Sequence, residues 1–326
     1  MDLIAELEAR LGAVADHPAH EGFVAATRHI KVAVRRLGQG RADRDDDAYN
    51  DVVYRTNQAF EGMLKEAYAV LASTDTKSMT PAKLEQHFAK GDLFTPRVMD
   101  LFRNYRQDWR NPSTHDHRLI FRESEALLAI VSVSAFAAIL LDQVVAHVSS
   151  QREAAVVAPR REQILKRMPT EPNADVYTRT RDLVFSFANE WARDKDRDIS
   201  ESQLMGRLIG FMSLLAPDLT IQQQPRLSNM PPLQPDLLVS SQAEKVLVEL
   251  RRHGHQPEVV SQGHILLLGL MEASGLSKAI LFVGSDVGET DIVTTTTGYD
   301  LQGRQVDIAT VAPKRINDGK GAKSRF

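Results

Sequence analysis

The hydrophobic pattern of this 326-residue chain changes its period near residue 150. Before that point apolar residues recur at spacings of three and four, which is typical of amphipathic helices. After it, short apolar runs of strand type alternate with helical stretches. The length suits two domains of ordinary size. We therefore predict a multidomain protein in which an N-terminal helical bundle precedes an α+β domain built on a mixed sheet.

The helical domain is predicted to cover residues 1–150. Its apolar spacings predict helices over 1–16, 20–37, 46–73, 80–90, 95–110 and 123–149. The run from Ala126 to Leu141 carries no charge, but it is shorter than the roughly 18 to 20 residues that span a bilayer, and it contains Ser132 and Ser134. We interpret this run as a buried helix and expect no membrane contact.

Residues 151–173 contain three prolines among charged residues and no strand pattern, so we predict a linker, with a short helix around 161–167. The second domain is predicted to span 174–313, and a basic tail covers 314–326. The helices and strands expected in this domain are helices at 176–193, 200–215 and 258–274, and strands at 219–226, 236–240, 246–251, 278–284, 291–296 and 305–311.

The composition limits which kinds of binding and catalytic site this chain can contain. A net charge of -3 provides no global basic field, so any contact with nucleic acid must be local. The absence of cysteine excludes disulfides, thiolate metal sites and a cysteine nucleophile. The first residues lack a basic stretch followed by an apolar core, so they do not form a secretory signal, and we expect a cytoplasmic protein.

The first candidate site is the segment Arg110-Asn111-Pro112-Ser113-Thr114-His115. Proline suits the first turn of a helix, which would make Asn111 an N-cap and place His115 about one turn into the helix. Arg110 would then lie beside His115, where a guanidinium can hold a phosphodiester while an imidazole moves a proton. Glu61 or Glu66 could orient the imidazole.

The alternative for this segment is a turn with no catalytic role. In that case Arg110 pairs with an acid such as Asp108 or Asp116, and His115 is exposed to solvent. The sequence leaves both interpretations open.

The stretch from Tyr105 to His115, followed by the helix Glu123 to His147, resembles the HEPN family, whose members are often ribonucleases of defence and toxin systems. The resemblance implies that Arg110 positions the scissile phosphate, His115 is the general acid or base and Asn111 supports them. It implies metal-independent cleavage of RNA by the ribose 2'-hydroxyl, with no cofactor, and a homodimer that unites two motifs, with the 126–141 face in the interface. His117 replaces the tyrosine that antitoxins modify in one toxin branch, so that regulation is not expected.

The second candidate site combines Pro235-Asp236 with Glu249-Leu250-Arg251 on successive predicted strands. Two carboxylates on adjacent strands can bind a hard divalent cation that activates water. The order of elements over 176–312 resembles the PD-(D/E)xK nuclease fold. By that resemblance Asp236 and Glu249 would bind Mg²⁺, with Glu201 as an additional ligand. Arg251 replaces the family's lysine; its guanidinium can stabilise charge but cannot readily act as a base.

Three functions remain open. The first is an endoribonuclease of an antiviral or abortive-infection system, in which the second domain recognises nucleic acid or cuts it with Mg²⁺. The second is a Mg²⁺-dependent DNA endonuclease whose helical domain only dimerises. The third is a catalytically inactive dimeric sensor or scaffold, in which Asp236 and Glu249 are ordinary acids at a sheet edge. The expected partners are RNA, DNA and a second copy of the chain.

Overall fold

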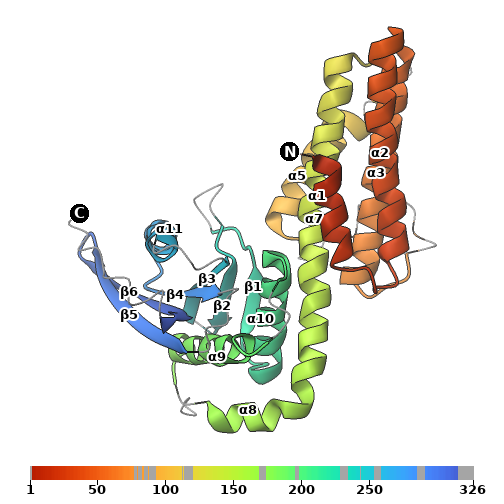
Figure 1. The fold of residues 1–326 in the computed structure, drawn as a ribbon. Coiled ribbons are helices and arrows are strands. Elements are labelled where there is room, and N and C mark those ends of the chain that lie inside the picture. Colours follow the sequence, from red (N-terminus) through yellow and green to blue (C-terminus); the bar gives the residue numbers. More distant parts are fainter. Residues whose placement is uncertain are drawn as a thin grey trace. The chain divides into compact units, whose positions relative to one another are not determined.

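The computed structural model describes residues 2–76, 79, 83, 87, 93–111, 113, 120–168, 174–194, 198–227, 234–242, 244–252, 258–284 and 291–314. The chain divides into two compact units, Met1–Val148 and Ser149–Phe326. Within the described residues the fold is mixed: helices make up the first unit, and the second adds a six-stranded mixed sheet (Figure 1). The predicted helix at 80–90 lies, apart from Lys83 and His87, outside these residues.

The first unit is built on a long helical hairpin. Small residues let α2 and α3 approach closely: a Cβ on Gly62 of α3 would lie 3.1 Å from the Cβ of Ala26 on α2, and a Cβ on Gly22 would overlap the Glu66 carboxyl group. The described helices of this unit are α1 (Leu3–Gly12), α2 (His20–Asp43), α3 (Asp47–Leu71), α5 (Pro96–Tyr105), the π-helical turn η1 (Arg106–Arg110) and α7 (Glu123–Val157), which continues into the second unit.

Helix α7 supplies the core of the first unit. Phe136 of α7 lies 4.8 Å from the ring centroid of Phe60 on α3, which also stacks on Phe102 and Tyr105 of α5 at 5.6 and 4.5 Å. Among the described residues, the stretch Glu123–Arg167 is long and apolar enough to cross a membrane, but 61% of its most apolar window is buried inside the protein. A buried core helix passes the same test, and these contacts give α7 that role.

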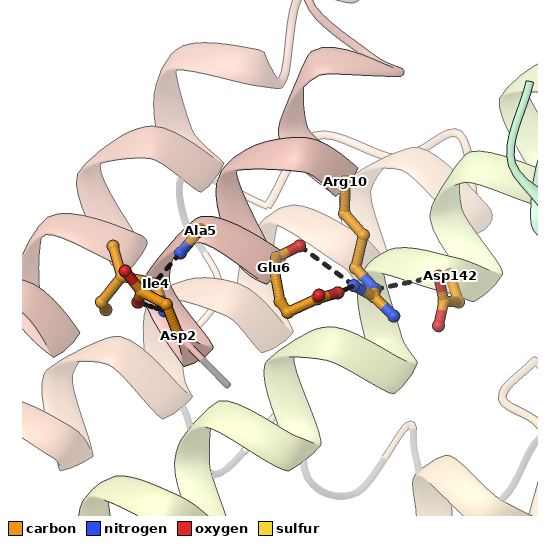
Figure 2. Close-up of polar contacts among 6 residues, drawn as sticks. All are labelled: Asp2, Ile4, Ala5, Glu6, Arg10 and Asp142. Carbon is orange, nitrogen blue, oxygen red and sulfur yellow. Dashed lines mark hydrogen bonds and ion pairs between the residues drawn. The ribbon is translucent and has the colours of Figure 1, made fainter. Parts of the chain in front are cut away.

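Helix α1 is capped by Asp2 and connected to α7 by Arg10 (Figure 2). The Asp2 carboxylate accepts hydrogen bonds from the backbone N–H groups of Ile4 and Ala5, which have no partner inside the helix. Arg10 pairs with Glu6 one turn earlier, at 2.9 Å, and with Asp142 of α7, at 3.1 Å. The second pair connects α1 to the core helix.

The sheet of the second unit has the strand order β1-β2-β3-β4-β6-β5. The first three strands are antiparallel, β4 lies parallel to β3 and β6, and β5 is antiparallel to β6. The parallel pair β3 and β4 requires a crossover, which α11 provides. The strands are β1 (Thr220–Gln223), β2 (Leu237–Ser241), β3 (Glu244–Arg252), β4 (Lys278–Gly284), β5 (Ile292–Leu301) and β6 (Arg304–Pro313).

Helices cover both faces of this sheet (Figure 1). Along β3, Val246 and Val248 belong to the core shared with α9 (Val176–Trp191) and α10 (Glu201–Leu215). Leu247, between them, belongs to the core shared with α11 (Glu258–Ser274). Because successive strand side chains point to opposite faces, an apolar run of this kind fits a strand that is buried on both sides.

The predicted linker is helical over much of its length. Helix α7 extends to Val157, eight residues past its predicted end; a 3₁₀ turn (Ala158–Arg160) and α8 (Arg161–Arg167) follow. The extension is stabilised from the side, because Glu153 pairs with Arg207 of α10 at 2.7 Å and Val157 is buried. Residues 169–173 and 315–326, which include nearly all of the predicted basic tail, lie outside the described residues.

Strand β5 also runs further than predicted. It continues to Leu301, which pairs with Arg304 of β6 across a two-residue turn. The turn residues Gln302 and Gly303 have φ values of 54° and 83°. Positive φ at both central positions is the type I′ geometry that matches the twist of a hairpin, and glycine at the second position relieves its strain.

Replacement of Gly210 by alanine should destabilise the second unit. A Cβ there would overlap the backbone carbonyl of Ser150 on α7, so the steric cost, about 1 to 3 kcal/mol, outweighs the gain in helix propensity. The control is Gly269→Ala on α11, where nothing lies within 4 Å of a new Cβ and a gain of up to about 1 kcal/mol is expected. Urea unfolding of both variants measures the difference; equal stabilities would contradict the close contact.

Candidate functional site

Asp236 and Glu249 are cross-strand neighbours in the second unit. Leu237, the first residue of β2, pairs with Val248 of β3, so Asp236 and Glu249 stand opposite each other one position further on. The backbone N–H of Asp236 lies 3.4 Å from Oε2 of Glu249, and the N–H of Leu250 donates to Oδ2 of Asp236 at 2.8 Å. The sequence prediction that these two acids lie on neighbouring strands is confirmed.

The pair is removed from water on the α11 side of the sheet. Leu247 contributes to the core beneath α11, and Glu249, two residues later, points to the same face. Glu249 is only 3% exposed. Carboxylates are rarely buried to this degree without a compensating charge, because losing their hydration is costly.

Burial and mutual repulsion change the titration of the pair. Burial raises the pKa of Asp236 to about 6, with a further increase from the charge of Glu201 and an opposing effect of the Leu250 N–H and of Arg251. Burial raises the pKa of Glu249 to about 8, and the charge of Asp236 adds to this increase. At neutral pH the two carboxyl groups therefore keep a proton, as expected for neighbouring acids in a dry site.

Arg251 supplies the nearest positive charge. Its guanidinium lies 2.9 Å from Oε1 of Glu249, and its side chain is one-third exposed, so it borders both the carboxyl pair and the solvent. Arg252, the next residue, pairs instead with Asp198 at 2.9 Å. Among the described residues, Arg251 is thus the cation paired with Glu249, at the position where the resemblance to PD-(D/E)xK nucleases leads one to expect a lysine.

Glu201 is the exposed first residue of α10 and lies close enough for its charge to raise the pKa of both buried acids. Among the described residues, however, no group of three or more acidic or histidine side chains is arranged to hold a metal ion. The three predicted ligands therefore form a close pair and one more distant acid. Such a donor set suits Mg²⁺, which is commonly bound by one or two carboxylates and several waters.

The first unit places Arg110 at the end of a π-helical turn. This differs from the prediction that Asn111 is an N-cap. Asn111 has helical φ and ψ values of -68° and -49°, and its N–H donates to the carbonyl of Arg106, so it continues the preceding helix. An N-cap residue has non-helical φ and ψ, so that prediction was wrong. Pro112 and His115 lie outside the described residues.

Arg110 is held by an acid from α3. Its Nε lies 3.4 Å from Oε1 of Glu61, its Nη1 lies 3.4 Å from Oδ1 of Asn111, and its side chain is 19% exposed. Glu61 was expected to orient His115, and the structure shows it bound to Arg110. Glu66, the other expected partner, lies over Gly22 of α2, and burial raises its pKa. Single π-helical turns within α-helices occur frequently at functional sites.

A chain of hydrogen bonds that the sequence prediction missed supports this turn. The Tyr105 hydroxyl donates to Oδ1 of Asn57 at 3.1 Å, and Nδ2 of Asn57 donates to Oγ of Ser113 at 2.6 Å. The Ser113 hydroxyl donates to the carbonyl oxygen of Arg110 at 3.1 Å. Asn57 lies on α3, more than fifty residues before the motif, and an isolated asparagine in a helix carries no signal that would reveal this role.

Comparisons with known proteins do not add to these observations: no family model, no curated protein and no solved structure matches the chain. The functional argument therefore rests on the geometry of the two sites.

The carboxyl pair predicts a specific pH dependence of stability. Unfolded carboxyl groups ionise near pH 4, whereas the folded pair ionises at higher pH. Between these values the folded state binds more protons, so the free energy of unfolding should fall as the pH rises from about 5 to about 8. Thermal unfolding of the metal-free protein measures this. Glu249→Gln should flatten the profile, and an unchanged slope in that variant would contradict the assignment.

Proposed function

We propose that the second unit is a Mg²⁺-dependent nuclease with Asp236 and Glu249 as its metal-binding acids. The observation that carries this proposal is the pair of buried, neighbouring carboxyl groups on β2 and β3, which keep a proton beside an arginine. Strongly shifted pKa values of this kind concentrate at functional sites. A bound divalent cation would take the place of the proton.

The arrangement of the strands supports the same function. Three antiparallel strands are followed by the crossover helix α11 and by β4 parallel to β3, an order compatible with the PD-(D/E)xK fold that the sequence resembles. By that resemblance Asp236 and Glu249 would be the acids of the motif. Glu201, on the helix before β1, adds negative charge for a cation or for a water bound to it.

The residues divide the chemistry between them. Bound Mg²⁺ supplies a Lewis acid that lowers the pKa of water and neutralises phosphate charge. Asp236 and Glu249 hold their oxygens in fixed positions because backbone N–H groups and the strand register constrain them. Arg251 remains protonated, so it binds a non-bridging phosphate oxygen and does not remove a proton from water.

Cleavage of single- and double-stranded DNA and RNA in Mg²⁺ or EDTA tests this proposal. We expect cleavage only with Mg²⁺, and a loss of at least about 100-fold in Asp236→Asn and Glu249→Gln, since each removes a charged ligand. Arg251→Lys should keep activity, and Arg251→Ala should lower it. Glu272→Gln, an acid of α11 bonded to Gln302, is the matched control. Wild-type cleavage by Glu249→Gln would exclude the assigned site.

We infer a second activity for the first unit: metal-independent cleavage of RNA. The specific observation is Arg110, largely buried, bound by Glu61 and braced by the Asn57–Ser113 hydrogen bonds. Its guanidinium would hold the scissile phosphate. The role of His115 as general acid or base comes from the resemblance of the sequence to HEPN ribonucleases, and Asn111, bonded to Arg110, would support the pair.

This activity is expected to need a dimer, and α7 offers an interface. Leu127, Leu128 and Val131 are 42%, 55% and 42% exposed within the first unit, at spacings that place them on one face of the helix. Exposed apolar residues in such a cluster favour association with another surface. We propose a cytoplasmic homodimer. Its service in an antiviral or abortive-infection system is what the pairing of the two resemblances implies.

RNA cleavage in EDTA separates the two activities. His115→Ala and Arg110→Lys should each lower cleavage by at least about 100-fold, because they remove proton transfer and bidentate phosphate binding. Glu249→Gln should leave this cleavage intact. Arg103→Ala, an exposed arginine of the same unit paired with Asp100, is the control. The 2',3'-cyclic phosphate on the product is read by mass spectrometry. A protein that cleaves nothing in either assay would support the scaffold interpretation instead.

A further inference from the structure

An exposed tyrosine stands at the surface of the helical hairpin, between polar partners. Tyr54 of α3 is 58% exposed. Its hydroxyl accepts a hydrogen bond of 2.8 Å from Nε2 of Gln58, one turn later, and the Arg55 guanidinium lies 6.0 Å from the ring centroid. Arg55 also donates to Oε1 of Gln58 at 3.3 Å. The ring is therefore held in place with much of its surface open to solvent.

Two side chains of α2, His29 and Arg28, lie near Arg55. The Nη1 atom of Arg55 lies 3.5 Å from Nδ1 of His29, and Arg28 is exposed beside it. Burial lowers the pKa of His29, and the charges of Arg55 and Arg28 lower it further, which shows that excess positive charge gathers there.

Three other cations of the hairpin are paired with acids. Lys31, Arg36 and Arg41 of α2 pair with Glu8, Asp51 and Glu123. Among the described residues, by contrast, no ion pair involves Arg28 or Arg55. Neither guanidinium is therefore neutralised by a described acid, and both can bind an anionic ligand.

The same helix connects this patch to the candidate ribonuclease site. Tyr54, Gln58 and Glu61 follow one another on one face of α3 at helical spacing, and Glu61 binds Arg110. Tyr54 and Glu61 are seven residues apart, about 10 Å along the helix axis. A ligand lying along this face can therefore touch Tyr54 and Arg110 at once.

We propose that Arg28, His29, Tyr54 and Arg55 form a binding site for single-stranded RNA, which we call the Tyr54 patch. The ring of Tyr54 stacks on an unpaired base, and the two arginines bind the phosphates beside it. Duplexes hide their base faces inside the stack, so an exposed ring flanked by arginines suits a single strand. The path from this patch to Arg110 rests on the proposed ribonuclease function, whereas the binding itself does not.

Fluorescence anisotropy with a labelled 12-nucleotide single-stranded RNA, full-length protein and EDTA tests the site. Every protein in this assay, including the wild-type reference, also carries His115→Ala, so that the RNA stays intact under the proposed ribonuclease function. Tyr54→Ala should weaken binding about tenfold, the effect of losing one base–aromatic stack, with an unchanged salt dependence. Tyr54→Phe should bind nearly as the wild type. Arg55→Ala should weaken binding and reduce the slope of log affinity against log salt by about 0.7, the value for one phosphate contact. Circular dichroism checks that each variant is folded.

The control is Arg103→Ala, which removes an equally exposed arginine from α5 of the same unit. If Arg103→Ala and Arg55→Ala change affinity and salt slope equally, or if Tyr54→Ala binds as the wild type, the Tyr54 patch is not the site. Equal affinity for duplex RNA would also overturn the proposal, as would a wild-type protein that does not bind. Tight binding in this assay, with no RNA cleavage by the protein that keeps His115, would overturn the ribonuclease function alone, and this site would stand.

Discussion

The exclusion of water from the charge-free face of α7 organises the first unit. Phe136 of that helix packs on Phe60 of α3, and Phe60 in turn stacks on Phe102 and Tyr105 of α5. This aromatic cluster fixes the end of α5, from which the π-helical turn with Arg110 continues. The position of a candidate catalytic arginine therefore follows from hydrophobic packing, and the hydrogen bonds of Asn57 refine it.

In the second unit, hydrophobic packing also buries a carboxyl group, which is unfavourable for stability. Apolar side chains on both faces of β3 bury its middle, from Val246 to Leu250, and Glu249 is buried with them. The raised pKa of its carboxyl group shows that the site works against stability at neutral pH. Groups that a fold retains at such a cost are commonly the ones that it needs for binding or chemistry.

Much of the fold was predictable because local periodicity decides it. The spacing of apolar residues located α9, α10, α11 and the strands around Asp236 and Glu249, and the register then made these acids neighbours. The errors occurred where contacts from distant segments decide. Asn111 is helical although a proline follows it, and α7 continues past its predicted end because Glu153 finds Arg207 of α10. The local sequence around residue 111 or residue 153 does not reveal such tertiary effects, which can override local propensity.

The sequence by itself determined the order of helices and strands, the absence of thiol chemistry and the residues available for each site. Only the tertiary structure decided which of them meet: Glu61 binds Arg110, Arg251 binds Glu249, and Arg55 adjoins His29. The tertiary structure also decided which side chains are exposed: Tyr54 is in contact with solvent, whereas Glu249 is buried. The reason is physical, since periodicity depends on near neighbours along the chain, whereas pKa values and contacts depend on whatever packing brings close in space.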